Sequence, residues 1–330
     1  MKLKKLPSKI TVGVFSSSSP ISATVPERYE RGKNYLLSKG ISVVDGALYG
    51  KSDFYRSGSI KERADEFNAL LHNDEIDVIM ASIGGNNTNS ILPYIDYEYI
   101  KKHPKVIVGY SDTTALLLAV YAKTGVPVFY GPALASSFGE FPPFVDMTYN
   151  SFCDIVLFPK DVPYVYENPP FWTDERLDWK TQDREKTRCE NALITAGEGK
   201  CRGRLIGGNL NTMEGFFGTP YMPKIKRGDV LLIEDSLKDA CTIERSFSLL
   251  ELAGVFDKVG GIILGKHELF DDNGTGRRPV DILLEVIGDR NIPILADFDC
   301  CHTHPMHTLP IGCEVILDAG EKRLTLVESP

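Results

Sequence analysis

The chain has 330 residues, of which 42% are hydrophobic and 25% charged, enough for a large core and typical of two globular domains. Its net charge of −8 and pI near 5.4 come without long runs of like charge, which argues against nucleic acid or an anionic membrane as a partner. No apolar stretch approaches the roughly 20 residues that cross a bilayer. We expect a small soluble enzyme whose substrate is a small molecule or peptide.

The N-terminal segment and the cysteines both indicate a cytoplasmic protein. The apolar run "ITVGVF" is about half as long as the core of a signal peptide. It leads into "SSSSP" instead of a cleavage site, so we interpret it as a first strand. The seven cysteines are odd in number and lack C-x-x-C spacing, which is typical of reduced thiols.

Residues 1–160 alternate short β-branched runs with helical periodicity. Strands are expected at "ITVGVF", "ISVV", "IDVIMASIGG", "KVIVGY" and "VPVFYG". Helices are expected over Pro26–Lys39, Ile60–His72 and Asp112–Thr124, with a short one after Thr88. This pattern predicts an α/β domain with an open, doubly wound parallel sheet, which binds ligands at the carboxyl ends of its strands.

Residues 161–189 lose this periodicity. They are rich in proline and charge and contain both tryptophans of the chain, Trp172 and Trp179. We interpret this segment as a linker between domains that also serves as a substrate loop.

Residues 190–330 resume regular patterning. The strands "DVLLIED", "GGIILGK" and "IPILADFD" alternate with helices near 243–252 and 279–289, and the chain ends in a hairpin that turns at Ala319 and Gly320. We predict a second α/β domain with antiparallel strands.

The stretch "VGYSDTTALL" places Ser111 where a predicted strand turns into a helix. A hydroxyl at such a corner stands above the sheet edge, and the first helical N–H groups point toward the atom it attacks, as in a nucleophile elbow. Thr113 replaces the last glycine of G-x-S-x-G. Because serine before a helix is also a good N-cap, the motif alone leaves both roles open.

A serine nucleophile needs a base, and the base needs an orienting carboxylate. Three of the six histidines lie in "CCHTHPMHTLPIG", and Glu234 ends the apolar part of "DVLLIED". Ser111, Glu234 and His302 follow the order nucleophile, acid, base of α/β hydrolases, and each comes from a strand end. A solvated carboxylate and a surface histidine are the structural alternatives.

The same Cys–His run has a second interpretation as a metal site, because zinc prefers thiols and imidazoles. Its spacing matches neither H-E-x-x-H nor paired C-x-x-C, and Pro305 interrupts any helix that would align His304 with a further ligand. We therefore predict no metal and no other cofactor.

Two glycine turns follow predicted strands. In "SIGGNNTNS", glycine lets backbone N–H groups approach a ligand, so Gly84 and Gly85 are candidates for half of an oxyanion hole, with the N–H of Asp112 as the other half. The second turn, "LIGGNLNT", contains Asn209, a candidate substrate-binding residue. The structural alternative is a tight turn for the first motif, and a bend or close packing against the first domain for the second.

Together these motifs resemble the LD-carboxypeptidase family of serine peptidases, within its microcin C immunity branch. "SSSSP", "GGNNTN", "VGYSDTTALL", "LIGGNLNT", "GDVLLIEDS", "GGIILGK" and "HTHPMHTLPIG" appear in the family's order across nearly the whole chain, and "WTDE" resembles the immunity-type loop. The resemblance implies a triad of Ser111, Glu234 and His302, with the oxyanion hole on the backbone of Gly85 and Asp112. It also implies a flavodoxin-like first domain, a swivelled second domain and a homodimer. Cys301 departs from the family, which typically has glycine before the histidine.

A carboxypeptidase must also hold the charged ends of its substrate. Lys238 and Arg245 are candidates for a carboxylate, with a solvated helix face as the alternative, which we favour for Arg245. Glu268 is a candidate for an amine. Stacking on Trp172 or Trp179 would suit an adenine base, and spacing does not say which of the two faces a ligand.

The expected activity is cleavage of an amide bond in aminoacyl or peptidyl nucleotides of the microcin C type. Peptidoglycan tetrapeptides cut at the L,D bond are the competing substrates, although a muropeptide has nothing flat to stack on. A non-catalytic nucleotide-binding module, in which Ser111 is only a cap, is the alternative from another class.

Overall fold

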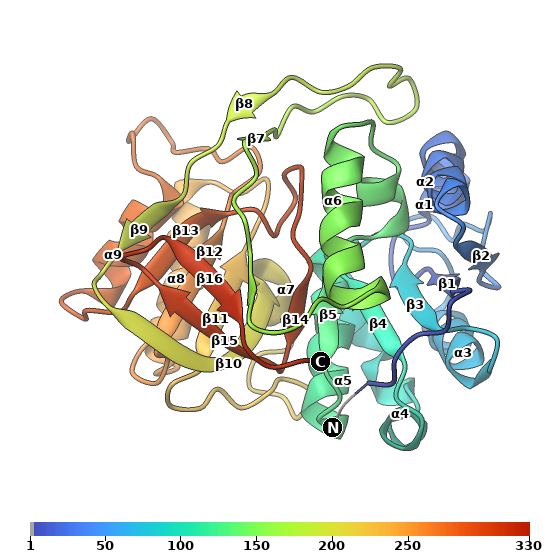
Figure 1. The fold of residues 1–330 in the computed structure, drawn as a ribbon, viewed down its shortest axis with the longest axis horizontal. Coiled ribbons are helices and arrows are strands. Elements are labelled where there is room, and N and C mark those ends of the chain that lie inside the picture. Colours follow the sequence, from blue (N-terminus) through green and yellow to red (C-terminus); the bar gives the residue numbers. More distant parts are fainter. Residues whose placement is uncertain (1–2) are drawn as a thin grey trace.

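The computed structural model describes residues 3–330, which form two halves, each built on one large sheet (Figure 1). The elements of the first half are β1 (Thr11–Phe15), α1 (Ile21–Thr24), α2 (Pro26–Ser38), β2 (Ser42–Asp45), α3 (Ile60–His72), β3 (Val78–Ala81), η1 (Thr88–Tyr94), α4 (Tyr97–Lys102), β4 (Val106–Gly109), η2 (Ser111–Thr113), α5 (Thr114–Thr124), β5 (Val128–Tyr130), η3 (Leu134–Phe138), α6 (Phe144–Phe152) and η4 (Cys153–Leu157).

The remaining elements belong to the connecting segment and the second half. They are β6 (Tyr164–Val165), β7 (Phe171–Trp172), β8 (Cys189–Glu190), β9 (Ile194–Ala196), β10 (Lys200–Asn209), α7 (Leu210–Glu214), β11 (Val230–Glu234), α8 (Ala240–Leu252), β12 (Gly261–Gly265), α9 (Pro279–Ile287), β13 (Ile294–Phe298), β14 (Leu309–Ile311), β15 (Glu314–Asp318) and β16 (Arg323–Leu326).

The first sheet has the strand order β14-β5-β4-β3-β1-β2. Its strands β1 to β5 are parallel to one another, and β3, β4 and β5 are buried along their whole length. Parallel strands covered on both faces favour such continuous apolar runs. The order 2-1-3-4-5 is that of flavodoxin-like sheets, so the predicted doubly wound domain is confirmed.

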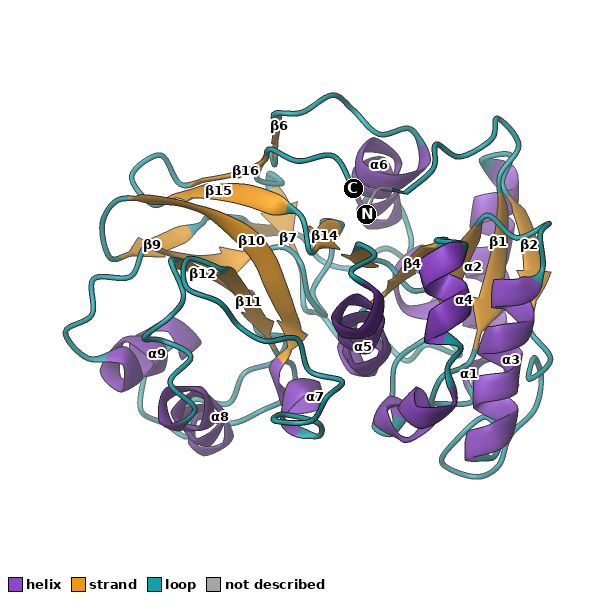
Figure 2. Cartoon of the chain, turned by 90° about the horizontal axis from the view of Figure 1, so that it is seen from below, coloured by secondary structure: helices purple, strands orange, loops and turns teal. Residues whose placement is uncertain are grey.

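The second sheet has the order β6-β16-β15-β10-β11-β12-β13-β9. Its centre, β10 to β13, is parallel, while β15, β16, β6 and β9 add antiparallel strands on the two flanks (Figure 2). The terminal hairpin turns over residues 319–322, as its glycine and alanine predict. An α/β sheet with antiparallel strands is therefore confirmed for the second half.

Two strands cross the predicted domain limits. β6, from the segment expected to be a linker, pairs with β16 of the second sheet. β14, from the C-terminal part of the chain, pairs antiparallel with β5 of the first sheet. Because an open sheet edge leaves N–H and C=O groups unpaired, β14 completes the edge beside β5 and ties the two halves together.

Local signals account for most element limits. Helix α3 covers the predicted residues and begins with a capping box between Ser59 and Glu62. Helix α5 ends at Gly125, whose φ of 71° is left-handed. It begins at Thr114, two residues later than expected, because Ser111–Thr113 form a separate 3-10 turn.

Within residues 3–330, no helix is both long and apolar enough to cross a membrane.

Candidate active site

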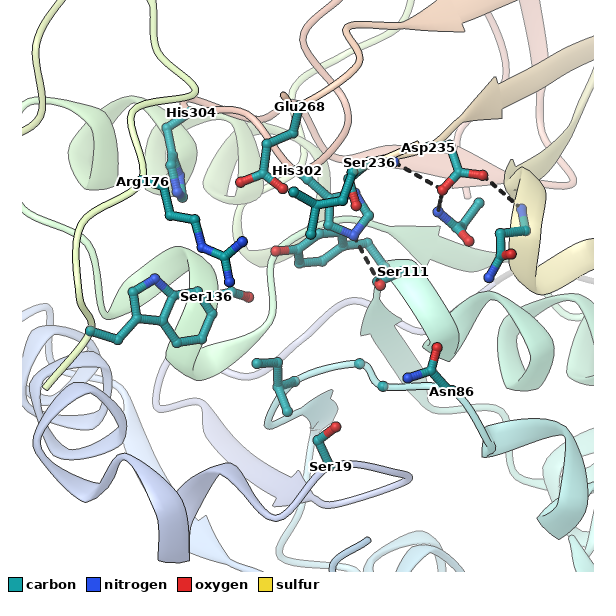
Figure 3. Close-up of a pocket in the computed structure, with 18 of the residues that line it drawn as sticks. Ser19, Asn86, Ser111, Ser136, Arg176, Asp235, Ser236, Glu268, His302 and His304 are labelled. Atoms are coloured by element: carbon teal, nitrogen blue, oxygen red, sulfur yellow. Dashed lines mark hydrogen bonds between the residues drawn. The ribbon is translucent and has the colours of Figure 1, made fainter. Parts of the chain in front are cut away.

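A cavity of about 940 Å³ lies at the carboxyl ends of strands from both sheets (Figure 3). One wall comes from the first half and contains Ser111 and the loop around Gly85. The other comes from the second half and contains His302 and residues 235–238, and the segment 176–179 closes a third side. The strand-end rule for parallel sheets therefore places the ligand site where both sheets meet.

Ser111 occupies the turn between β4 and α5. Its φ of 58° is unusual for a residue with a side chain, and such left-handed backbone costs about 1–3 kcal/mol unless the surrounding structure holds it. The N-cap positions of η2 and α5 are held by Tyr110 and Thr113, so Ser111 is the N-cap of neither. Instead, Ser111 Oγ lies 2.9 Å from His302 Nε2 (Figure 3). The geometry is that of a hydroxyl aimed at a base.

His302 lies between Ser111 and a buried carboxylate. Its Nδ1 is 2.9 Å from Oε2 of Glu234, whose side chain is fully buried at the end of β11. Burial lowers the pKa of His302, but the charge and hydrogen bond of Glu234 outweigh it and raise that pKa above its usual range. Burial raises the pKa of Glu234, but His302 and hydrogen-bond donors bring it below its usual range. The three side chains thus form a continuous chain that supports proton transfer from the serine.

Two further donors hold Glu234. Asn209 Nδ2 donates to Oε1 at 2.9 Å, and the hydroxyl of Tyr130 donates to the same oxygen. Asn209 also caps α7, because its Oδ1 accepts the N–H of Thr212 at 2.9 Å. Asn209 also lines the cavity, so this residue both holds Glu234 and borders the space for the ligand.

The loop after β3 packs directly on the serine turn. A Cβ on Gly84 would lie 2.9 Å from Ser111 Oγ and 3.1 Å from the N atom of Asp112, so only glycine leaves room there. Gly85 has a φ of 153° and lines the cavity. The buried carboxylate of Asp112 accepts the N–H groups of Asn87 and Thr88, each at 2.9 Å. Asp112 therefore fixes this loop against the turn, and its backbone N atom lies beside Gly84, the neighbour of Gly85.

The clustered histidines and cysteines separate into different environments. His304 is buried, and its Nε2 lies 3.7 Å from Glu140. His307 Nδ1 lies 3.3 Å from the hydroxyl of Ser151. Cys301 is buried, and its Sγ lies 2.5 Å from the carbonyl oxygen of Lys266. The part of the chain that the structure describes contains no group of three or more His, Cys, Asp or Glu side chains arranged to hold a metal ion.

Of the residues predicted to hold the charged ends of a substrate, two line the cavity and one does not. Lys238 and Glu268 both line the cavity, and burial raises the pKa of the Glu268 carboxyl. Lys238 Nζ lies 3.9 Å from Oδ1 of Asp235. Arg245 is exposed on α8 and does not line the cavity, which agrees with the solvated helix face favoured for it.

The two tryptophans have different surroundings. Trp179 lines the cavity, and the guanidinium of Arg28 lies 4.3 Å from its ring centroid. Trp172 pairs with Cys189 in the small β7–β8 sheet and does not line the cavity. The Nζ of Lys266 lies 5.1 Å from its ring centroid. The structure thus places only Trp179 against the ligand space, because β7 holds Trp172 in a separate strand pair.

Several cavity residues were not predicted as site residues, although Asp235 ends the motif "DVLLIED". Ser136, Arg176, Lys186 and Asp235 line the space, and Figure 3 shows Arg176 and Glu268 on the same side of His302. Burial and the neighbouring Glu234 raise the pKa of Asp235 to about 6. Tyr130 contacts Glu234 without lining the cavity. The strand end "VPVFYG" is the one signal that pointed near it.

Family models match both halves of the chain. The model of the LD-carboxypeptidase N-terminal domain matches residues 12–131, and the model of the C-terminal domain matches residues 202–317.

Relatives match over nearly the full length. A putative carboxypeptidase of Vibrio cholerae is 55% identical over 307 residues, which is 93% of this chain and 92% of that protein. The microcin C7 self-immunity protein MccF of Escherichia coli is 52% identical over 320 residues, which is 96% of this chain and 93% of that protein.

Solved structures agree with the fold. An MccF mutant in complex with adenosine monophosphate superimposes with a TM-score of 0.96 at 51% identity. MccF in complex with aspartyl sulfamoyl adenosine gives a TM-score of 0.97, also at 51% identity. Each comparison covers 99% of this chain and 98% of the other. The chain therefore belongs to the LD-carboxypeptidase family of serine peptidases.

Proposed function

We propose that the protein is a serine carboxypeptidase that hydrolyses an amide bond in aminoacyl or peptidyl nucleotides, with Ser111 as nucleophile, His302 as base and Glu234 as acid. The observation that carries the proposal is the position of His302, which contacts Ser111 and Glu234 at 2.9 Å each on the wall of the large cavity. Family membership supports the same class of reaction.

The chemistry follows from the geometry. His302 Nε2 takes the proton as Ser111 Oγ attacks the amide carbonyl, and Glu234 stabilises the resulting imidazolium through Nδ1. The N–H groups of Gly85 and Asp112 stabilise the oxyanion, a contribution of roughly 3–4 kcal/mol for each donor in other hydrolases. His302 then protonates the leaving amine, and a water molecule, deprotonated by the same ring, releases the acyl group from Ser111.

Trp179 supports a nucleotide in preference to a muropeptide. Its indole lines the cavity and offers a flat apolar face, and stacking on a base contributes about 1–3 kcal/mol. The related MccF structures hold adenosine monophosphate and aspartyl sulfamoyl adenosine. In this proposal Lys238 binds a negatively charged group of the substrate and Glu268 binds an amine, and both residues line the cavity. The physiological role would then be self-immunity or detoxification.

A direct comparison of substrates tests this proposal. We expect an aminoacyl-adenylate analogue with a cleavable amide to be hydrolysed, whereas an L,D-tetrapeptide from peptidoglycan is cleaved slowly or not at all. The reverse preference would replace nucleotide detoxification with cell-wall recycling. Binding of adenosine monophosphate without hydrolysis of either compound would favour the non-catalytic module.

The cytoplasmic location and the homodimer belong to the same proposal. Among the residues that the structure describes, no cysteine forms a disulfide bond, which suits a reducing compartment. The homodimer rests on the family alone. Sedimentation of the purified protein at several concentrations tests it, with a monomer at every concentration as the contrary result.

A further inference from the structure

Tyr130 lies between the two chain segments that carry Ser111 and His302. Its backbone pairs on one side with Gly109 of β4, two residues before Ser111, and on the other side with Leu309 of β14, shortly after the histidine loop. Its side chain is 1% exposed. Strand pairing on both sides therefore fixes where this side chain can reach.

The Tyr130 hydroxyl connects the two halves of the molecule. Its oxygen accepts the N–H of Ser111 at 3.3 Å, and its O–H donates to Oε1 of Glu234. Burial and the nearby charge of Glu234 raise the pKa of Tyr130 well above its usual range, so the hydroxyl stays protonated at all working pH values. One oxygen atom thus links the backbone of the nucleophile to the acid.

We propose that Tyr130 is a positioning residue that sets the geometry of Ser111 relative to Glu234. With Tyr130 and Asn209 both donating to Oε1, the other oxygen, Oε2, is directed at His302. At the opposite end, the hydroxyl holds the N–H of Ser111, whose left-handed backbone aims Oγ at the same imidazole. The proposal rests on the hydrolytic function proposed above.

The Tyr130→Phe variant removes only this hydroxyl. We expect kcat to fall roughly 10- to 100-fold with little change in KM, because small displacements of reacting groups have effects of that size. A fluorophosphonate gives a readout that needs no natural substrate. Ser111 Oγ displaces its fluoride, forming a phosphorus–oxygen bond while His302 takes the proton, and labelling should slow by the same factor.

The pH profile separates positioning from general loosening. Without the Tyr130 donor, the Glu234 carboxylate is less stabilised by hydrogen bonds and interacts more strongly with the imidazolium. The pKa of His302 should rise, and the acid limb of kcat/KM and of the labelling rate should move to higher pH. A merely structural change would lower rates without moving this limb.

Tyr166→Phe is the matched control. Tyr166 is also buried, and its hydroxyl donates to the carbonyl oxygen of Thr308 at 3.1 Å, away from the reacting groups. We expect this variant to lose thermal stability but to keep the wild-type labelling rate and pH profile. Equal losses of rate in Tyr130→Phe and Tyr166→Phe, or unchanged labelling in Tyr130→Phe, would overturn the proposal.

A second replacement keeps the test decisive if Tyr130→Phe does not fold. Incorporation of 3-fluorotyrosine at position 130 keeps the shape of the ring and makes the hydroxyl a stronger donor. The acid limb should then move to lower pH, and an unmoved limb would count against the proposal. If wild-type Ser111 labels rapidly but neither the aminoacyl-adenylate analogue nor the L,D-tetrapeptide is cleaved, the proposed function fails while the labelling rates still test Tyr130. If wild-type Ser111 does not label, both fail.

Discussion

The carboxyl ends of β4 and β11 supply the site in different ways. After β4, the backbone conformation positions the functional side chain. Ser111 adopts a left-handed φ, and glycine at position 84 leaves room for the serine. At the end of β11, the side chain matters most, because Glu234 is a fully buried carboxylate surrounded by donors. Replacing Ser111 should abolish hydrolysis with little loss of stability. Replacing Glu234 should alter the charge of the site, the tautomer of His302 and the pH dependence of activity.

The largest effect is expected at the serine turn. Ser111→Ala should lower kcat roughly 10⁶-fold, as loss of a serine nucleophile does in other hydrolases. The free energy of unfolding should change by less than about 1 kcal/mol, since the hydroxyl supports no core. Single-turnover kinetics and denaturant unfolding measure both quantities. Turnover near the wild-type value would show that Ser111 is not the nucleophile.

At the end of β11, Glu234→Gln should lower kcat roughly 10⁴-fold. Tyr130 and Asn209 would still donate to the amide oxygen, so the new NH₂ group would face His302 Nδ1. The ring would then have to carry its proton on Nε2, where it cannot accept the proton of Ser111. A loss of less than about tenfold would contradict the role of the acid.

The two tryptophans allow the same comparison in the connecting segment. Trp179→Ala should raise KM for an aminoacyl-adenylate analogue roughly 5- to 150-fold, equivalent to about 1–3 kcal/mol of stacking. Trp172→Ala should leave KM nearly unchanged and lower thermal stability, because its ring packs beside Lys266. Steady-state kinetics and thermal unfolding of both variants provide the check. A larger increase in KM in Trp172→Ala than in Trp179→Ala would mean that Trp172, and not Trp179, contacts the ligand.

The smallest expected effect is a shift in the pH profile of the wild-type enzyme, away from the profile that an ordinary histidine would give. The pKa of His302 is raised, because Glu234 outweighs the effect of burial, so the acid limb of kcat/KM should lie above the usual histidine value near 6.5. Below that pKa, activity should fall about tenfold per pH unit, because protonated His302 cannot accept a proton. The stability from this raised pKa is fully present below pH 6.5 and is lost as the pH rises through the folded pKa. An acid limb below 6.5 would contradict this assignment.

Sequence periodicity predicted the first sheet well, because each βαβ unit carries its own signals. Buried apolar strands, a capping box at Ser59 and a left-handed glycine at position 125 are all local features. The predicted domain limits at residues 160 and 190 did not show which strands belong to which sheet. Pairing of β6 with β16 and of β14 with β5 joins segments that lie more than 150 residues apart, and no local pattern specifies such partners.

For the site, the sequence by itself determined the residue types and the strand ends from which they come. Ser111, Glu234 and His302 each follow a hydrophobic run, and the chain order of a hydrolase triad made them candidates before any distance was known. Only the tertiary structure decided which neighbours complete the arrangement. Tyr130 reaches Glu234 from the other sheet, and Trp179 lines the cavity while Trp172 does not. The physical reason is that hydrogen bonds and ring contacts depend on positions within about 3–6 Å, which long-range strand pairing sets and sequence spacing does not.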